Sequence, residues 1–116
     1  MFTVDIVSPC GGGKSGIEKV LKSWKKFHDI KIRFIHFGKG IEYLEGYKEA
    51  YEIDIYDENK AIASQINAMA KAYADFIMKY GKPIISIGLN YPVMSKIIRV
   101  SQKLLTKENK DEYIKV

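Results

Sequence analysis

Three glycines, a lysine and a serine stand between an apolar run and a helical pattern in the segment SPCGGGKSGIEKVLKSW. A glycine-rich turn that opens a helix presents backbone N–H groups at the positive end of the helix dipole. Such a turn is a suitable site for an anion, above all for the phosphate groups of a nucleotide. We therefore expect Gly11, Gly12 and Gly13 to bind substrate phosphate, with Lys14 and Ser15 beside them.

Two common phosphate-binding motifs fit this segment only in part. Gly13, Lys14 and Ser15 match the end of a P-loop, but Ser8 occupies the position of its first glycine, and no apolar strand ends in an aspartate that would hold magnesium. The dinucleotide fingerprint fits in glycine spacing alone, because no acidic residue ends the second predicted strand. A P-loop-like NTPase or nucleotide-binding module stays open as the alternative. A response-regulator-like domain is disfavoured, because no acidic cluster follows the first strand.

Alternating strand and helix patterns predict an α/β domain around this turn. Strand patterns are found at residues 2–9, 30–37, 51–55, 83–89 and 113–116, and helical patterns at residues 17–27, 60–80 and 94–105. We predict one Rossmann-like, doubly wound domain over residues 1–116, with a mainly parallel sheet of about five strands in the order 3-2-1-4-5 and helices on both faces. The continuous apolar run PIISIGL predicts an internal strand, and the one-sided alternation of YEIDIY predicts a strand near an edge.

Composition narrows the class of protein without naming a function. The chain of 116 residues is 47% hydrophobic and 28% charged, which is typical of a folded globular domain. Its net charge of +5 is compatible with several anionic partners, and its single cysteine, Cys10, favours an intracellular protein. No apolar run approaches the ~20 residues that span a bilayer. We expect a cytoplasmic protein, with peripheral contact to the inner face of a membrane as an option.

The segment IVSPCGGGKSGIEKVL resembles the first strand, glycine-rich loop and first helix of the N-terminal domain of GT-B fold glycosyltransferases of family GT4. In that family a Gly-Gly pair is followed by a short stretch and then by Glu-Arg-Val or a close variant, and here Glu18, Lys19 and Val20 stand in that place. The similarity extends more loosely over the rest of the chain, through IRFIHFG, the helix before PIISIGLNYP and the final EYIKV.

The resemblance implies the acceptor-side half of a two-domain transferase. Such an enzyme moves a sugar from a nucleotide-sugar donor to a glycan or lipid-linked acceptor, in the synthesis of cell-surface polysaccharide or lipopolysaccharide. The donor is held mainly by a C-terminal domain, which these 116 residues do not contain, so we expect the isolated chain to be inactive. We expect no metal ion, no cofactor and no nucleic acid, and the catalytic residues stay unassigned.

The same resemblance suggests roles for individual residues. The amides of the three glycines would approach the donor diphosphate and the acceptor. Lys14 would add a cation, although a solvated lysine is the simpler account, and Ser15 departs from the small or apolar residues of the family loop. Glu18 would contact substrate or merely interact with the helix dipole. Asn90 and Tyr91 would reach an acceptor hydroxyl, with helix capping as the competing role of Asn90.

Overall fold

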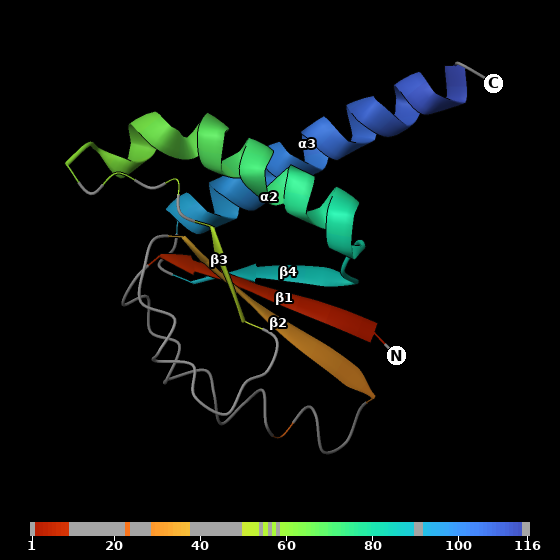
Figure 1. The fold of residues 1–116 in the computed structure, drawn as a ribbon, viewed down its shortest axis with the longest axis horizontal. Helices are drawn as coiled ribbons and strands as arrows, with labels where there is room; N and C mark the ends of the chain where they lie inside the picture. The colour runs from red at the N-terminus through yellow and green to blue at the C-terminus, as the bar shows by residue number, and fades with distance from the viewer. Residues whose placement is uncertain are drawn as a thin grey trace.

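The computed structural model describes residues 2–9, 23, 29–37, 50–53, 55, 57, 59–89 and 92–114. These residues form four strands, two α-helices and one short 3-10 helix (Figure 1). In chain order they are β1 (Phe2–Pro9), β2 (Ile30–Phe37), β3 (Ala50–Ile53), the 3-10 helix η2 (Ile62–Gln65), α2 (Ile66–Tyr80), β4 (Ile85–Gly88) and α3 (Val93–Ile114).

The strands form one parallel sheet in the order β3-β2-β1-β4. Strand β1 lies in the middle, with Val4 opposite Ile32 of β2 on one side and Ile85 of β4 on the other. The short strand β3 adds to the outer side of β2. The predicted α/β class is confirmed, as are the parallel pairing of the first and fourth strands and the edge position of YEIDIY.

Helices α2 and α3 cover one face of the sheet (Figure 1). A large apolar cluster joins them to Val7, Ile35 and Phe37, which point to that face. A smaller cluster lies on the opposite face and contains Val4, Ile6, Ile32 and Phe34. The predicted helix at residues 17–27 lies outside the described residues except for Ser23, which is helical and exposed, so helices on both faces remain a prediction.

Helix α2 forms where the apolar spacing predicts it. Its buried residues recur every three or four positions, as one stripe of an amphipathic helix requires: Met69, Ala70, Tyr73, Ala74, Phe76 and Ile77. The helix ends at Gly81, whose φ of 104° belongs to a region that favours glycine. The N–H of Gly81 still donates to the carbonyl of Ile77, at 2.8 Å.

The predicted internal position of PIISIGL is wrong within the described residues. Strand β4 pairs there with β1 alone, and Ile84 and Ile85 are 61% and 51% exposed. The strand predicted at residues 113–116 is also wrong where the structure describes it, because helix α3 continues through Ile114, and residues 115–116 lie outside the described part. No glycine or proline interrupts the chain between Val93 and Ile114, and its Lys, Glu and Gln residues favour helix, so nothing local ends the helix where we expected a charged turn.

Strand β2 is more deeply buried than its alternation of apolar and basic residues suggests. All six residues from Ile32 to Phe37 are buried, and Arg33 is only 3% exposed. The reason is that β2 has a neighbouring strand on each side and carries helix α2 over Arg33. A basic side chain that the sequence places on a polar face therefore lies inside the protein.

Candidate functional site

The residues that the sequence predicts as a substrate site all lie outside the described residues. They are Gly11, Gly12, Gly13, Lys14, Ser15, Glu18, Asn90 and Tyr91. The structure describes the strand before the glycine turn and the residues on both sides of Asn90 and Tyr91. Ser8 precedes the glycine turn at the end of β1, and Leu89 and Pro92 stand on either side of the Asn90–Tyr91 pair.

Ser8 occupies a buried position at the carboxyl end of the central strand. It pairs in register with His36 of β2, and both side chains are 0% exposed. Because Val7 and Ile35 face α2 and α3, Ser8 and His36 point to the opposite face of the sheet. Among the described side chains, the Ser8 Oγ is a buried polar atom without a hydrogen-bond partner. Such an atom costs about 1–3 kcal/mol, and at the start of a glycine-rich turn it marks a place for an additional donor or acceptor.

Gly88 brings the first turn of α3 against the end of β4. A Cβ atom on Gly88 would lie 2.9 Å from the Cβ of Met94 and 2.9 Å from the backbone N of Ser95. The absence of a side chain therefore allows a close approach of helix and strand. Beyond Gly88, the N–H of Leu89 donates to the carbonyl of Val7 at 2.8 Å, which keeps the exit of β4 beside the end of β1.

These contacts place the end of β1, the end of β4 and the N-terminus of α3 at one edge of the sheet. The chain runs from β1 outward through β2 to β3, and then returns to the other side of β1 with β4. The strand order thus reverses between β1 and β4, and in open α/β sheets ligands bind at the carboxyl ends of the strands at such a point. We call the group of Ser8, Gly88 and the first turn of α3 the carboxyl-edge site.

The carboxyl-edge site is suited to binding an anion through backbone groups. The first N–H groups of a helix have no carbonyl partner within the helix and favour negative charge. His36, buried beside Ser8, makes contacts within the protein. Within the described residues, no group of three or more His, Cys, Asp or Glu side chains could hold a metal ion.

A second polar constellation lies in the middle of the sheet, beneath α2. Arg33 binds Asp5 through two hydrogen bonds, from Nε to Oδ1 at 2.6 Å and from Nη2 to Oδ2 at 3.0 Å. The Tyr73 hydroxyl donates to Asp5 Oδ2 at 2.6 Å. A tyrosine hydroxyl has one proton, and this bond uses it. The Ser86 hydroxyl, 2.7 Å from the Tyr73 hydroxyl, therefore donates to it. The four side chains join β1, β2, β4 and α2, and we call them the Asp5 network.

Arg33 also binds the end of helix α2. Its Nη1 donates to the carbonyl of Tyr80 at 3.1 Å and its Nη2 to that of Gly81 at 2.8 Å, while its guanidinium lies 5.0 Å from the centre of the Phe76 ring. A cation is favourable at the negative end of a helix dipole. Arg33 therefore neutralises Asp5 and caps the helix at the same time.

The Asp5 network is structural rather than part of the carboxyl-edge site. Burial raises the pKa of Tyr73 far above its ordinary value of 10.0, and the negative charge of Asp5 adds to that rise. Tyr73 therefore stays neutral and donates a hydrogen bond. The helical pattern at residues 60–80 contains Tyr73 but does not reveal Asp5, Arg33 and Ser86 as members of its network. The available signal was Asp5, a lone acidic residue inside an otherwise apolar strand.

Comparisons of the chain with protein-family models, with curated proteins and with solved structures find no match. In the part of the chain that the structure describes, no helix is both long enough and apolar enough to cross a membrane.

Proposed function

We propose that this chain is the acceptor-side, N-terminal domain of a GT-B fold glycosyltransferase of family GT4. The activity is transfer of a sugar from a nucleotide-sugar donor to a glycan or lipid-linked acceptor in cell-surface polysaccharide or lipopolysaccharide synthesis. In this proposal the domain is Rossmann-like and doubly wound, and the segment after Pro9 forms a crossover helix on the second face of the sheet. The protein works in the cytoplasm, at the inner face of the membrane where its acceptor is presented.

The observation that carries the proposal is the position in the sheet of the end of β1, the strand that precedes the glycine turn in the sequence. Strand β1 ends at Pro9, next to the strand-order reversal, and in the sequence the three glycines come directly after Cys10. The close approach at Gly88 puts the N-terminus of α3 on the other side of that reversal. Two segments with free amides would thus border one crevice, which is the arrangement that a diphosphate requires. The unpartnered Ser8 hydroxyl is available to bind the loop or the ligand.

The proposal gives each predicted site residue a part in substrate binding. Gly11, Gly12 and Gly13 allow the backbone to approach the donor diphosphate, and their amides offset the charge that develops as the nucleotide leaves. One side of the proposed crevice, next to the helix predicted at residues 17–27, would carry Lys14, Ser15 and Glu18. The other side, next to α3, would carry Asn90 and Tyr91, which would contact an acceptor hydroxyl. A second domain supplies most of the affinity for the donor.

Titration of the 116-residue chain with nucleotides tests the proposal. We expect UDP, GDP and their sugar conjugates to bind with a Kd above about 100 μM, which corresponds to less than about 5.5 kcal/mol, because the donor-binding domain is missing. Amide resonances of Ser8, Leu89 and the first turn of α3 should shift in two-dimensional NMR spectra, without dependence on magnesium. Gly12→Val should abolish these shifts, and Ala63→Val, which places the same side chain at an exposed position on η2, should not.

Two results would overturn the proposal. Magnesium-dependent binding of ATP or GTP near 1 μM would identify a P-loop-like NTPase instead, since that affinity corresponds to about 8 kcal/mol within one domain. Shifts confined to residues away from the carboxyl-edge site would remove that site from the function. In a chain that carries the second domain, Gly12→Val or Gly13→Val should lower the transfer rate at least about tenfold, or about 1.4 kcal/mol of transition-state stabilisation.

A further inference from the structure

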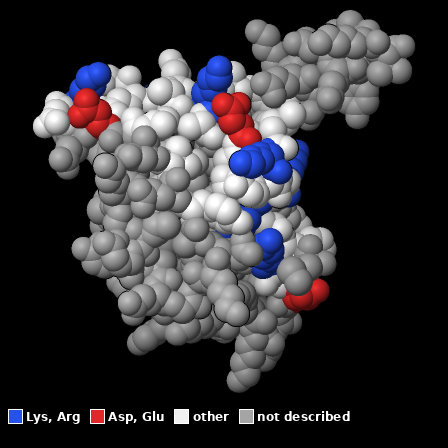
Figure 2. Space-filling model, viewed as in Figure 1, with Lys and Arg blue, Asp and Glu red and all other residues white. Residues whose placement is uncertain are grey.

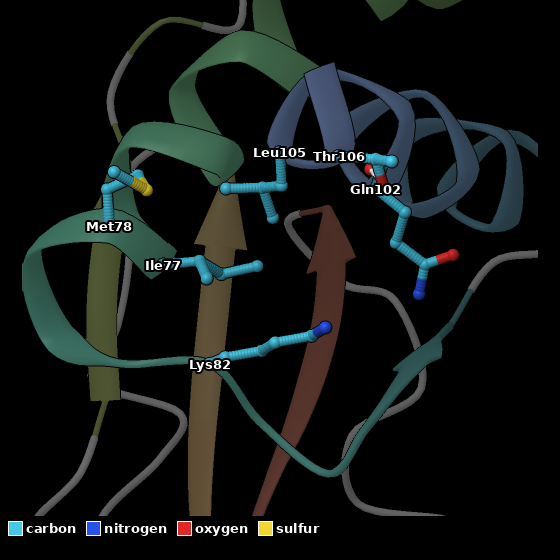
Figure 3. Close-up of a pocket in the computed structure, with 6 residues that line it drawn as sticks. All are labelled: Ile77, Met78, Lys82, Gln102, Leu105 and Thr106. Atoms are coloured by element: carbon cyan, nitrogen blue, oxygen red, sulfur yellow. Dashed lines mark hydrogen bonds between the residues drawn. The ribbon is translucent and has the colours of Figure 1, made fainter. Parts of the chain in front are cut away.

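A cavity of about 470 Å³ lies between the end of α2 and the second half of α3, away from the carboxyl-edge site. Its wall is formed by six residues: Ile77, Met78, Lys82, Gln102, Leu105 and Thr106 (Figure 3). Small-molecule sites in proteins have volumes of roughly 300–1,000 Å³. The cavity is therefore large enough to hold a small organic ligand.

The cavity lining combines buried apolar residues with exposed residues, most of them polar. Ile77 and Leu105 are 6% and 8% exposed, and their side chains lie between α2 and α3 (Figure 3). Lys82, which follows α2, and Gln102, on α3, are both exposed and contribute polar ends to the lining (Figure 3). Thr106 donates its hydroxyl proton to the carbonyl of Gln102 at 2.9 Å, so its proton is used within the helix.

Lys82 and Gln102 are the lining residues whose side-chain nitrogens can donate hydrogen bonds to a ligand. Within the part of the chain that the structure describes, Lys82 has no ion-pair partner. Lys79 and Lys103 are exposed on the two helices that form the cavity. In Figure 2, Lys and Arg side chains gather on the side of the molecule where α2 ends. A ligand with one negative charge is favoured here over a neutral or cationic one.

We propose that this cavity binds a medium-chain carboxylate, with the acyl chain against Ile77, Met78 and Leu105 and the carboxylate at Lys82 Nζ and Gln102 Nε2. Ile77 and Leu105 are buried and Met78 is 54% exposed, so the acyl chain would gain apolar contact mainly from the first two, while an exposed lysine and an exposed amide satisfy the charged end without burying it. The inference does not depend on the proposed glycosyltransferase activity, because the two sites share no residue.

The test is an NMR titration of the protein with hexanoate, octanoate and decanoate, each below the concentration at which it forms micelles. Amide resonances near Ile77, Lys82 and Leu105 should shift. Affinity should rise about threefold to fourfold for each methylene group that enters the cavity, the factor that corresponds to ~0.8 kcal/mol per buried methylene. Octanol, which has the same chain without the charge, should bind more weakly than octanoate.

Lys82→Gln provides the decisive comparison. We expect it to weaken octanoate binding about threefold to tenfold and to leave octanol binding unchanged, because it removes the cation and keeps most of the side chain. Lys71→Gln, an equal change at an exposed site on α2 outside the cavity, should change neither affinity. Equal binding of octanol and octanoate, equal effects of the two variants, or shifts that avoid the cavity would each overturn the proposal.

Discussion

Replacing Arg33 with methionine should destabilise the protein by about 4 kcal/mol. Methionine keeps the apolar stem of the side chain and removes the guanidinium. The substitution removes two hydrogen bonds and the positive charge from the Asp5 network, because the carboxylate of Asp5 is 0% exposed and accepts both bonds from Arg33. The remaining donor to Asp5 is Tyr73, at 2.6 Å.

The magnitude follows from what each contact of Arg33 does. Leaving a buried charge without its partner costs about 3–5 kcal/mol. The carbonyls of Tyr80 and Gly81 lose their donor as well, but both residues are exposed and water replaces the guanidinium, so this loss adds less than about 1 kcal/mol. A domain of this length has a stability of roughly 6–17 kcal/mol, at 0.05–0.15 kcal/mol per residue. The variant should therefore still fold, with a melting temperature about 15 °C lower.

A double-mutant cycle separates the ion pair from general damage to the core. Urea unfolding followed by circular dichroism would be measured for the parent, Arg33→Met, Asp5→Leu and the double variant. The free energy of unfolding of the double variant should be at least about 2 kcal/mol higher than the sum of the two single changes predicts. The reason is that the double variant contains no buried charge without its partner. Lys71→Met, the same replacement at an exposed site on α2, should stay within about 0.5 kcal/mol of the parent.

Either of two results would refute this reasoning. A stability of Arg33→Met within about 1 kcal/mol of the parent would mean that Asp5 is solvated or otherwise compensated. Strict additivity in the cycle would mean that the two side chains do not act as a pair.

Three further predictions concern single residues near the helix ends and the network. Because the pKa of Tyr73 is raised above 10.0 on folding, the stability that it contributes is fully present below pH 10 and should fall by up to about 1.4 kcal/mol per unit as the pH rises further. Urea midpoints from pH 9 to 11 would show this decline, and an equal decline in Tyr73→Phe would assign it to other groups. Gly88→Val should cost about 1–3 kcal/mol, because its Cβ would lie 2.9 Å from that of Met94, and an unchanged melting temperature would contradict the close approach. Gly81→Ala should cost about 1–2 kcal/mol through its φ of 104° alone, since no atom lies within 4 Å of the added Cβ, and an unchanged urea midpoint would show that alanine adopts this turn freely.

Much of the fold could be predicted because it depends on short-range patterns. The spacing of apolar residues in α2 and Gly81 at its end are both local signals, and the alternation of strands and helices limits the sheet to few topologies. The order of the first four strands follows from that alternation. The ligand site expected at the glycine turn stays a prediction, because Gly11, Gly12 and Gly13 lie outside the described residues.

The buried polar residues could not be predicted, because their environment comes from distant parts of the chain. Arg33 alternates with apolar residues, as a surface side chain would. Its burial depends on Asp5, which lies 28 positions earlier in the chain. It also depends on the carbonyls of Tyr80 and Gly81, which lie 47 and 48 positions later. Ser86 lies in an apolar run and shows no sign of a partner until α2 places Tyr73 over it.

The sequence by itself determined the class of the fold, the end of α2 at Gly81 and the order of first strand and glycine turn along the chain. Only the tertiary structure decided that β4 lies at the edge of the described sheet and that α3 continues through Ile114. An apolar run such as PIISIGL has the same composition whether a strand or solvent lies beside it, because hydrophobicity measures the cost of exposure and does not specify what covers a residue. Pairing and burial are properties of the assembled sheet, and they depend on which distant segments reach the same place.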